Sequence, residues 1–230
     1  MNKESLYENI GFRIRAFRKN RGMSLKDLAG YLNKSIATVS KYESGDVAIS
    51  IDVLIDICAC FDIDPGTLLP GPAPASEDTV IDRYSKFHED ALYIYWYNGE
   101  QNRVRSAFID NMGSHRTHSA LYMDINTPKD LEKATFIYTG EMDYSDTGTV
   151  FLYTNTMPPF DKMTLRVPSF TRRQTHRIGL MLSLSYYYQN VAAKVVATSV
   201  PVRDPSTLLP EVKLTADEIR EIRRSNFLIV

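Results

Sequence analysis

Hydroxyl-bearing and basic side chains gather in one short stretch of the sequence, between residues 24 and 44. Such groups bind the phosphate oxygens of a nucleic acid, and lysine also binds the O6 and N7 atoms of guanine. The stretch therefore has the residue types that contact with a nucleic acid requires.

The distribution of charge along the chain favours this interpretation. The net charge of the whole chain is only −1, but residues 1–45 hold nine basic residues against four acidic ones. Residues 46–69 hold five aspartates and no Lys or Arg. Phosphate binding requires a local basic surface and not a basic protein. The basic segment meets that requirement, and Arg21 is a further candidate for a phosphate contact.

Five short helices are predicted to position these residues. Apolar residues recur every three or four positions, which is typical of helices with one buried face. Ser24, Ser35 and Ser50 are the predicted N-caps, and Asp27 completes a capping box with Ser24. The predicted helices form a compact all-α domain and cover residues 6–20, 24–32, 35–43, 51–61 and 64–69.

The order of these residues is similar to that of a known family. The chain from Ile10 to Leu69 resembles the Cro/phage-repressor type of helix-turn-helix domain, the XRE family, and begins IGFRIRAFRKNRGMSLKDLAGYLNKSIATVSKYESGD. The resemblance covers roughly a quarter of the chain and implies binding to double-stranded DNA. It also implies that the third helix enters the major groove, where it presents Ile36, Ala37, Ser40 and Lys41, with the two apolar residues suited to thymine methyl groups. The other candidates for contact with DNA that it implies are Ser24, Lys26, Lys34, Ser35, Thr38 and Ser44.

Two further residues take their role from this resemblance. In the family, an arginine late in the first helix pairs with a glutamate that ends the third, and here these positions are Arg18 and Glu43. We interpret the pair as a structural clamp without a part in base reading. The sequence departs from the family at Leu25, where a glutamine often contacts a phosphate, and at Ile36 and Ala37, where many relatives have polar residues.

The composition and the hydrophobic pattern of the chain change after residue 69. Residues 70–75 are rich in proline and indicate a linker, and residues 76–88 are predicted to form an amphipathic helix. Alternating apolar residues then predict a strand over 91–97, a turn at Asn98-Gly99 and a second strand through Val104 and Phe108. Further strands are predicted at 119–125, 134–144, 149–155, 162–167, 177–188 and 191–202.

These patterns predict an α+β protein of two domains. The N-terminal domain is expected to be the all-α helix-turn-helix unit, and the C-terminal domain a mainly antiparallel β-sandwich or barrel. In the 177–188 strand, Leu180 and Leu182 alternate with Met181 and Ser183, which predicts a sheet with one buried face. The expected divisions are 1–69, a linker with a possible helix at 70–90, the β-rich domain at 91–205, and a C-terminal helix and tail at 206–230.

Catalytic and metal-binding motifs are not found in the sequence. Cys58 and Cys60 point to different faces of one helix, and the pair His115 and His118 is too sparse for a metal centre. The chain contains no G-x-S-x-G, P-loop or dinucleotide motif. We therefore expect no enzyme, no metal and no cofactor. The N-terminus lacks a signal peptide and no apolar run could span a bilayer, so we expect a cytoplasmic protein without membrane contact.

Aromatic residues are the distinctive feature of the predicted β-domain. Tyrosine combines an apolar ring with a polar tip, which suits small-molecule pockets and protein interfaces but also suits a plain sheet surface. The candidates for a ligand site or an interface are Tyr95, Trp96, Tyr97, Tyr138 and Tyr186.

The sequence thus predicts a DNA-binding transcriptional regulator, expected to be a repressor, whose β-domain senses a small molecule or holds a dimer. The alternative is an antitoxin-like or partner-controlled regulator whose β-domain binds another protein. A helix-turn-helix unit reads one half-site, so we expect a homodimer, joined through residues beyond 80, on an inverted repeat.

Overall fold

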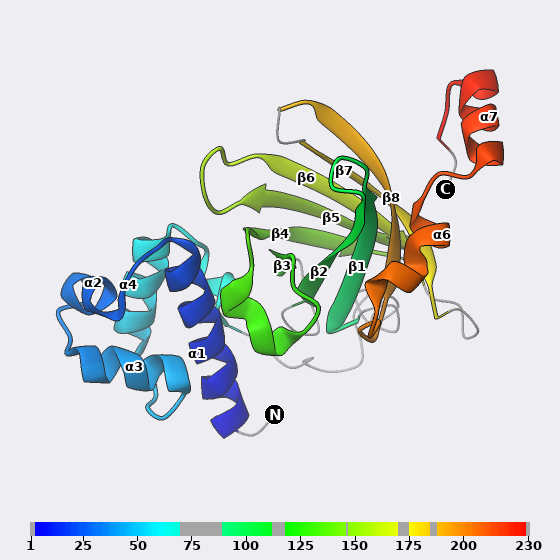
Figure 1. Ribbon diagram of the computed structural model, residues 1–230. Helices are drawn as coiled ribbons and strands as arrows, with labels where there is room; N and C mark the ends of the chain where they lie inside the picture. Colours follow the sequence, from blue (N-terminus) through cyan, green and yellow to red (C-terminus); the bar gives the residue numbers. More distant parts are fainter. Residues whose placement is uncertain are drawn as a thin grey trace.

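The computed structural model describes residues 3–69, 89–111, 118–145, 147–169, 175–184 and 188–228. Within them the chain forms an N-terminal group of helices and an eight-stranded antiparallel barrel, with further short helices at the C-terminal end (Figure 1). The predicted α+β architecture is therefore confirmed. The predicted linker over 70–75 and the predicted helix over 76–88 lie outside the described residues.

The N-terminal helices begin where the sequence places their caps. Ser24 caps α2 in a complete capping box with Asp27, and the Ser35 side chain accepts from the Thr38 N–H at the start of α3. Ser50 lies at the N-cap position of α4 but makes no side-chain cap bond, so this part of the prediction is wrong. The elements are α1 (Lys3–Asn20), α2 (Leu25–Tyr31), α3 (Ile36–Ser44), α4 (Ile51–Phe61) and the 3-10 helix η1 (Pro65–Thr67).

Two glycines allow α1 and α3 to approach each other closely. A Cβ on Gly11 would lie 2.6 Å from the carbonyl oxygens of both Tyr42 and Glu43. Gly45 ends α3 in the left-handed region with φ 79°, and a Cβ there would lie 2.6 Å from the backbone nitrogen of Glu8. Only glycine fits both sites without displacing backbone. The contact holds α3 firmly against α1.

The C-terminal domain is a closed barrel, which decides between the two predicted architectures. Each strand pairs with its sequence neighbour, and β8 pairs with β1 to close the sheet. The strands are β1 (Ala91–Asn98), β2 (Arg103–Asn111), β3 (His118–Met123), β4 (Ile137–Tyr144), β5 (Gly148–Asn155), β6 (Lys162–Pro168), β7 (Arg177–Leu184) and β8 (Asn190–Thr198).

Several predicted strand ends differ from the observed ones. The predicted strand over 134–144 begins only at Ile137, after the unpredicted 3-10 helix η2 (Pro128–Lys133). The predicted strand to residue 202 stops at Thr198, just before Pro201, which has no N–H to donate to a ladder. The predicted turn after β1 is present, but it takes four residues, 99–102, between the paired residues Asn98 and Arg103.

The barrel interior and its outer surface are both partly apolar. Leu92, Ile94 and Trp96 belong to the cluster that fills the interior, whereas Tyr93 and Tyr95 are buried on the outer side of the same strand. In β7, Met181 lies in the interior and Leu182 is 48% exposed on the outside. The strand therefore has the predicted single buried face, but the leucines are on the other face.

Short helices at the C-terminal end cover part of the outer surface. The elements η3 (Pro205–Leu208) and α6 (Leu209–Val212), which the sequence did not predict, bury Leu208 and Val212 in the same cluster as Tyr95. The predicted C-terminal helix is α7 (Ala216–Ser225), which begins with the expected capping box between Thr215 and Glu218. Figure 1 shows α7 at the opposite end of the barrel from α1.

The helical domain packs directly on the barrel. One cluster of buried apolar side chains runs from Phe17 and Leu68 of the helical domain to Phe108 and Tyr122 on the outer face of the barrel. Beside it, the Arg13 guanidinium donates to Asp110 Oδ2 from Nε at 2.9 Å and from Nη2 at 2.7 Å. Because this ion pair and the apolar cluster join the two domains, the position of α3 relative to the barrel is fixed through α1.

Candidate nucleic-acid interface

The turn between α2 and α3 sets the direction of the third helix. Asn33 takes the left-handed conformation with φ 52°, which asparagine tolerates better than most residues. The following Lys34 N–H donates to the Ala29 carbonyl at 3.0 Å. Val39, Tyr42 and Glu43 are the buried residues of α3. The opposite side of α3 is therefore left facing outward, and α1 lies between α3 and the barrel (Figure 1).

Nine of the ten predicted contact residues are exposed, and Thr38 is half-buried. The exposed side of α3 carries Ile36, with 49% of its surface accessible, together with Ala37, Ser40 and Lys41. Ser24, Lys26, Lys34, Ser35 and Ser44 are exposed around it. The structure thus places the predicted residues on the surface of one helix-turn-helix unit.

Two of the serines already use their hydroxyl protons within the chain. Ser24 Oγ donates to Asp27 Oδ2 at 2.7 Å, and Ser44 Oγ donates to Asp46 Oδ2 at 2.6 Å. A serine hydroxyl has a single proton to donate, and phosphate oxygens only accept. Exposed lysine ammonium groups, each with three donors, are therefore better placed than these serines to bind a phosphate.

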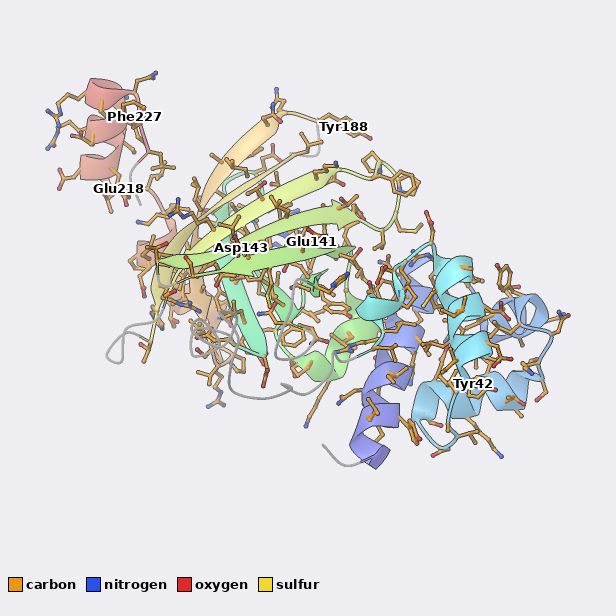
Figure 2. All side chains as sticks on the ribbon, turned by 180° about the vertical axis from the view of Figure 1, so that it is seen from behind. Tyr42, Glu141, Asp143, Tyr188, Glu218 and Phe227 are labelled. Atoms are coloured by element: carbon orange, nitrogen blue, oxygen red, sulfur yellow. The ribbon has the colours of Figure 1, made fainter. Side chains whose placement is uncertain are left out.

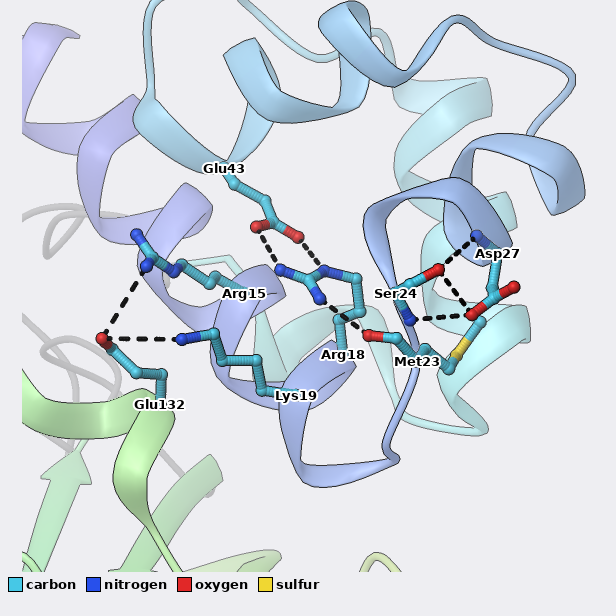
Figure 3. Close-up of polar contacts among 8 residues, drawn as sticks. All are labelled: Arg15, Arg18, Lys19, Met23, Ser24, Asp27, Glu43 and Glu132. Carbon is cyan, nitrogen blue, oxygen red and sulfur yellow. Dashed lines mark hydrogen bonds and ion pairs between the residues drawn. The ribbon is translucent and has the colours of Figure 1, made fainter.

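Arg18 and Glu43 form a bidentate ion pair behind the exposed face of α3 (Figure 3). Arg18 Nε donates to Oε1 at 2.5 Å and Nη2 to Oε2 at 2.8 Å, while Nη1 donates to the Met23 carbonyl at 2.7 Å. The side chains are only 8% and 6% exposed, and the hydrogen bond to Glu43 raises the pKa of Arg18. The pair joins α1, the end of α3 and the loop before α2.

Other basic residues of α1 face the barrel and not the exposed side of α3. Arg15 and Lys19 lie 3.8 Å from Glu132 of η2, as Figure 3 shows. Arg21 is half-buried, donates to the Phe61 carbonyl, and lies over the Phe61 ring; burial lowers its pKa. Arg21 is therefore not on the surface that carries Lys41, contrary to the phosphate contact that its charge suggested. Sequence patterns gave no signal that Glu132 is the acidic partner of Arg15 and Lys19, because Glu132 lies in η2, far along the chain from α1.

The predicted aromatic residues do not form one site. Trp96 and Tyr138 belong to the interior cluster, whereas Tyr95 packs in the outer cluster with Tyr97 against it. Tyr186 lies outside the described residues. The Tyr138 hydroxyl donates to Asp161 Oδ2 at 2.7 Å, and burial raises the Tyr138 pKa.

Tyr95 has a role in holding the C-terminal segment. Its hydroxyl donates to Asn126 Oδ1 at 2.6 Å and accepts from the Val202 N–H at 2.8 Å. Burial raises the Tyr95 pKa. On the same outer side, the Lys213 ammonium lies 4.6 Å from the centre of the Tyr97 ring. These tyrosines therefore fasten the chain after β8 to the barrel.

The described residues contain no group of three or more His, Cys, Asp or Glu side chains placed to hold a metal ion. Cys58 and Cys60 are free thiols, and burial raises the pKa of Cys58 to about 11. His118 lies 3.7 Å from Asp64, while His115 is outside the described residues. None of the helices described is both long and apolar enough to cross a membrane.

Comparison with known proteins identifies the N-terminal domain. Residues 14–68 match the family model described as helix-turn-helix, which confirms the resemblance seen in the sequence. One similar structure is the clp gene regulator ClgR from C. glutamicum, with 27% identity and a TM-score of 0.27 over 27% of this chain and 82% of that chain. Another is the DNA-binding domain of BldD, with 25% identity and a TM-score of 0.28 over 30% of this chain and 100% of that chain. No curated protein matches the chain significantly.

Proposed function

We propose that this protein, whose residues 14–68 form a helix-turn-helix domain, is a sequence-specific DNA-binding transcriptional regulator. The observation that carries the proposal is the two-sided character of α3. Val39, Tyr42 and Glu43 anchor one side, while Ile36, Ala37, Ser40 and Lys41 are exposed on the other. A helix held in this way can lie in the major groove, with Ile36 and Ala37 against thymine methyl groups and Lys41 against guanine.

The charges around α3 support this orientation. Lys26 and Lys34 are exposed beside α3, where they would contact phosphates on either side of the groove. Arg13, by contrast, is paired with Asp110 on the barrel and contributes little to the outer field. The exposed lysines therefore supply most of the sequence-independent attraction between this domain and the DNA phosphates.

Binding of the full chain to DNA tests the proposal. A selection from random duplexes should return one preferred sequence, and Lys41→Ala should weaken binding to that sequence by an amount typical of a base contact, ~1–3 kcal/mol. Lys26→Ala should instead lower the slope of log K against log salt by about 0.9. Lys162→Ala, which removes an exposed lysine of β6 on the barrel, is the control and should change neither. Binding that shows no sequence preference, or is unchanged in Lys41→Ala, would contradict the proposal.

Tight binding to an operator requires two copies of the chain. A pair of recognition helices about 34 Å apart reads an inverted repeat, and neither half-site alone gives high affinity. We assign the dimer contact to residues beyond 80, which leaves α3 free. Such a complex over a promoter would repress transcription, in the cytoplasm where the DNA is accessible.

The barrel is the element that would sense a signal in such a regulator. The described aromatic candidates Tyr95, Trp96, Tyr97 and Tyr138 are used in packing. Leu152 and Leu182, by contrast, are exposed on the outer surface at 57% and 48%. That surface favours a protein partner, either a second copy or another chain, over a small molecule bound among the tyrosines. Signals received by the barrel would reach α3 through the Arg13–Asp110 pair.

A further inference from the structure

The C-terminal helix α7 has an apolar side that the described residues of its own chain leave exposed. None of its residues is buried, and Ile219 is 39% exposed. On either side of the helix, Leu214 is 42% exposed and Phe227 69%. A helix of ten residues is marginal in water unless its apolar side packs on something. Within the part of the chain that the structure describes, the apolar side of α7 thus lacks the contact that would stabilise it.

The base of α7 is fixed while the helix extends away from the barrel. Glu218 accepts a hydrogen bond from the ammonium of Lys194 on β8 at 2.7 Å, and the Lys194 side chain is only 8% exposed. Just before α7, Val212 is buried against the barrel. Figures 1 and 2 both show the rest of α7 standing off from the strands, and in Figure 2 the labelled Phe227 lies further from them than Glu218.

The outer surface of β5, β6 and β7 is the second uncovered apolar surface. The register places Leu152, Thr164, Leu182 and Ala192 side by side across β5 to β8. Leu152 and Leu182 are 57% and 48% exposed. In the described part of the chain, helices pack extensively on β1, β2, β3 and β8, but none does so on β5 to β7. We call this row of four residues the outer apolar row, in which Thr164 is the one polar member.

Charged residues border the row in a way that matches α7. Glu141 and Asp143 of β4 are exposed and pair in register with Leu152 and Val150 of β5; Figure 2 labels both acids. On α7, the exposed arginines next to Ile219 and Ile222 are Arg220 and Arg224, which pair with Asp217 and Glu221 of the same helix, and Arg223. An amphipathic helix laid along the row would set Arg223 beside the two acids of β4.

We propose that α7 of a second copy of this chain covers the outer apolar row, and that each copy gives its helix to the other. Leu152 lies three strands from β8, about 14 Å at the usual strand spacing. The Glu218–Lys194 pair and the buried Val212 hold the N-terminal end of the chain's own α7 beside β8, and the rest of that helix stands off from the strands (Figure 1). A partner's helix is held to the partner's barrel instead, and the exchange makes two equal contacts around one two-fold axis. The inference deepens the proposed function, because it names the surfaces that join the two DNA-binding copies.

Sedimentation of three full-length variants tests the contact. The wild-type chain should be a dimer, and Ile219→Glu and Leu182→Glu should each shift it to monomer. Ile55→Glu is the matched control, because Ile55 is 47% exposed on α4, and it should stay dimeric. A monomeric wild type, or a dimer lost only in Ile55→Glu, would overturn the proposal.

Cross-linking decides the case in which a glutamate variant fails to fold. In a Cys60→Ser background, chains with Leu182→Cys are mixed with chains carrying Ile219→Cys and oxidised. A disulfide between the two different chains supports the exchange. A disulfide formed only within one chain that carries both cysteines would show that α7 covers its own barrel, and would refute it.

DNA binding separates failure of this inference from failure of the proposed function. The monomeric variants should bind a single half-site as the wild type does, but bind the inverted repeat 10²–10⁴-fold more weakly, roughly. Normal operator binding by a monomeric wild type would refute the proposed α7 contact but would leave the proposed DNA-binding function standing. No specific binding by any form would remove the proposed function itself.

Discussion

Replacement of Glu43 by alanine should destabilise the protein strongly, because the Glu43 carboxylate accepts two hydrogen bonds from the buried Arg18. The substitution removes two of the three hydrogen bonds that the Arg18 guanidinium makes and leaves the bond to the Met23 carbonyl. The Arg18 side chain is 8% exposed, so water cannot replace the lost carboxylate without opening the helical domain.

The magnitude follows from that burial. Breaking a buried ion pair by removal of one partner costs about 3–5 kcal/mol, a large part of the 5–15 kcal/mol that stabilises a typical domain, roughly. For a chain of this size each kcal/mol lowers the melting temperature by about 2–4 °C, so the loss should be roughly 6–20 °C. Glu43→Gln, which keeps the shape and one acceptor, should fall between wild type and alanine.

Thermal unfolding of the full chain, followed by circular dichroism, measures the effect. Glu132→Ala, in η2, is the control for another acid that pairs with α1, because it removes the 3.8 Å contacts to Arg15 and Lys19 at a partly exposed site. Pairs of that kind contribute about 0–1 kcal/mol, so the control should shift by no more than about 4 °C. A Glu43→Ala protein that melts no lower than this control would refute the reasoning.

The remaining predictions concern other contacts. Ile36→Gln should change the preferred base at one position of each half-site, with ~1–3 kcal/mol of discrimination seen in binding selections; an unchanged motif would remove Ile36 from base reading. Asp110→Ala leaves the Arg13 guanidinium with the Leu68 carbonyl as its remaining acceptor and should lower the free energy of unfolding by about 1–3 kcal/mol, measured by urea unfolding of the full chain. Wild-type stability would mean that the domains are held by apolar contacts only. Because burial raises the pKa of Cys58 to about 11, a thiol reagent at about pH 8 should label Cys60 first. Equal labelling of both in the folded chain would contradict that burial.

The helices were predictable because their signals are local. Ser24 and Ser35 start helices by bonding an N–H three residues away, and Gly45 ends one through its own φ of 79°. Such contacts leave a pattern within a few residues, which a sequence shows directly. The family landmarks in the same segment add Arg18 and Glu43, whose contact spans α1 and α3.

The barrel was harder to predict because it depends on distant pairings. Closure requires β1 to pair with β8, for example Tyr93 with Thr198, and no local pattern records such a pair. Both sides of β1 are apolar, so alternation did not show which side faces inward. The same ambiguity hid the outward leucines of β7, and the Arg13–Asp110 contact between the domains left no trace in the sequence.

A closed barrel also limits how this protein can meet other proteins. In an open sheet the outermost strand offers unpaired N–H and C=O groups, to which almost any extended chain can add. Here β1 and β8 satisfy each other, so no outermost strand is left for such addition. A partner must therefore be recognised by the shape, polarity and charge of side chains on the outer surface. Recognition of that kind is selective, and point substitutions can tune it without disturbing the backbone of the fold.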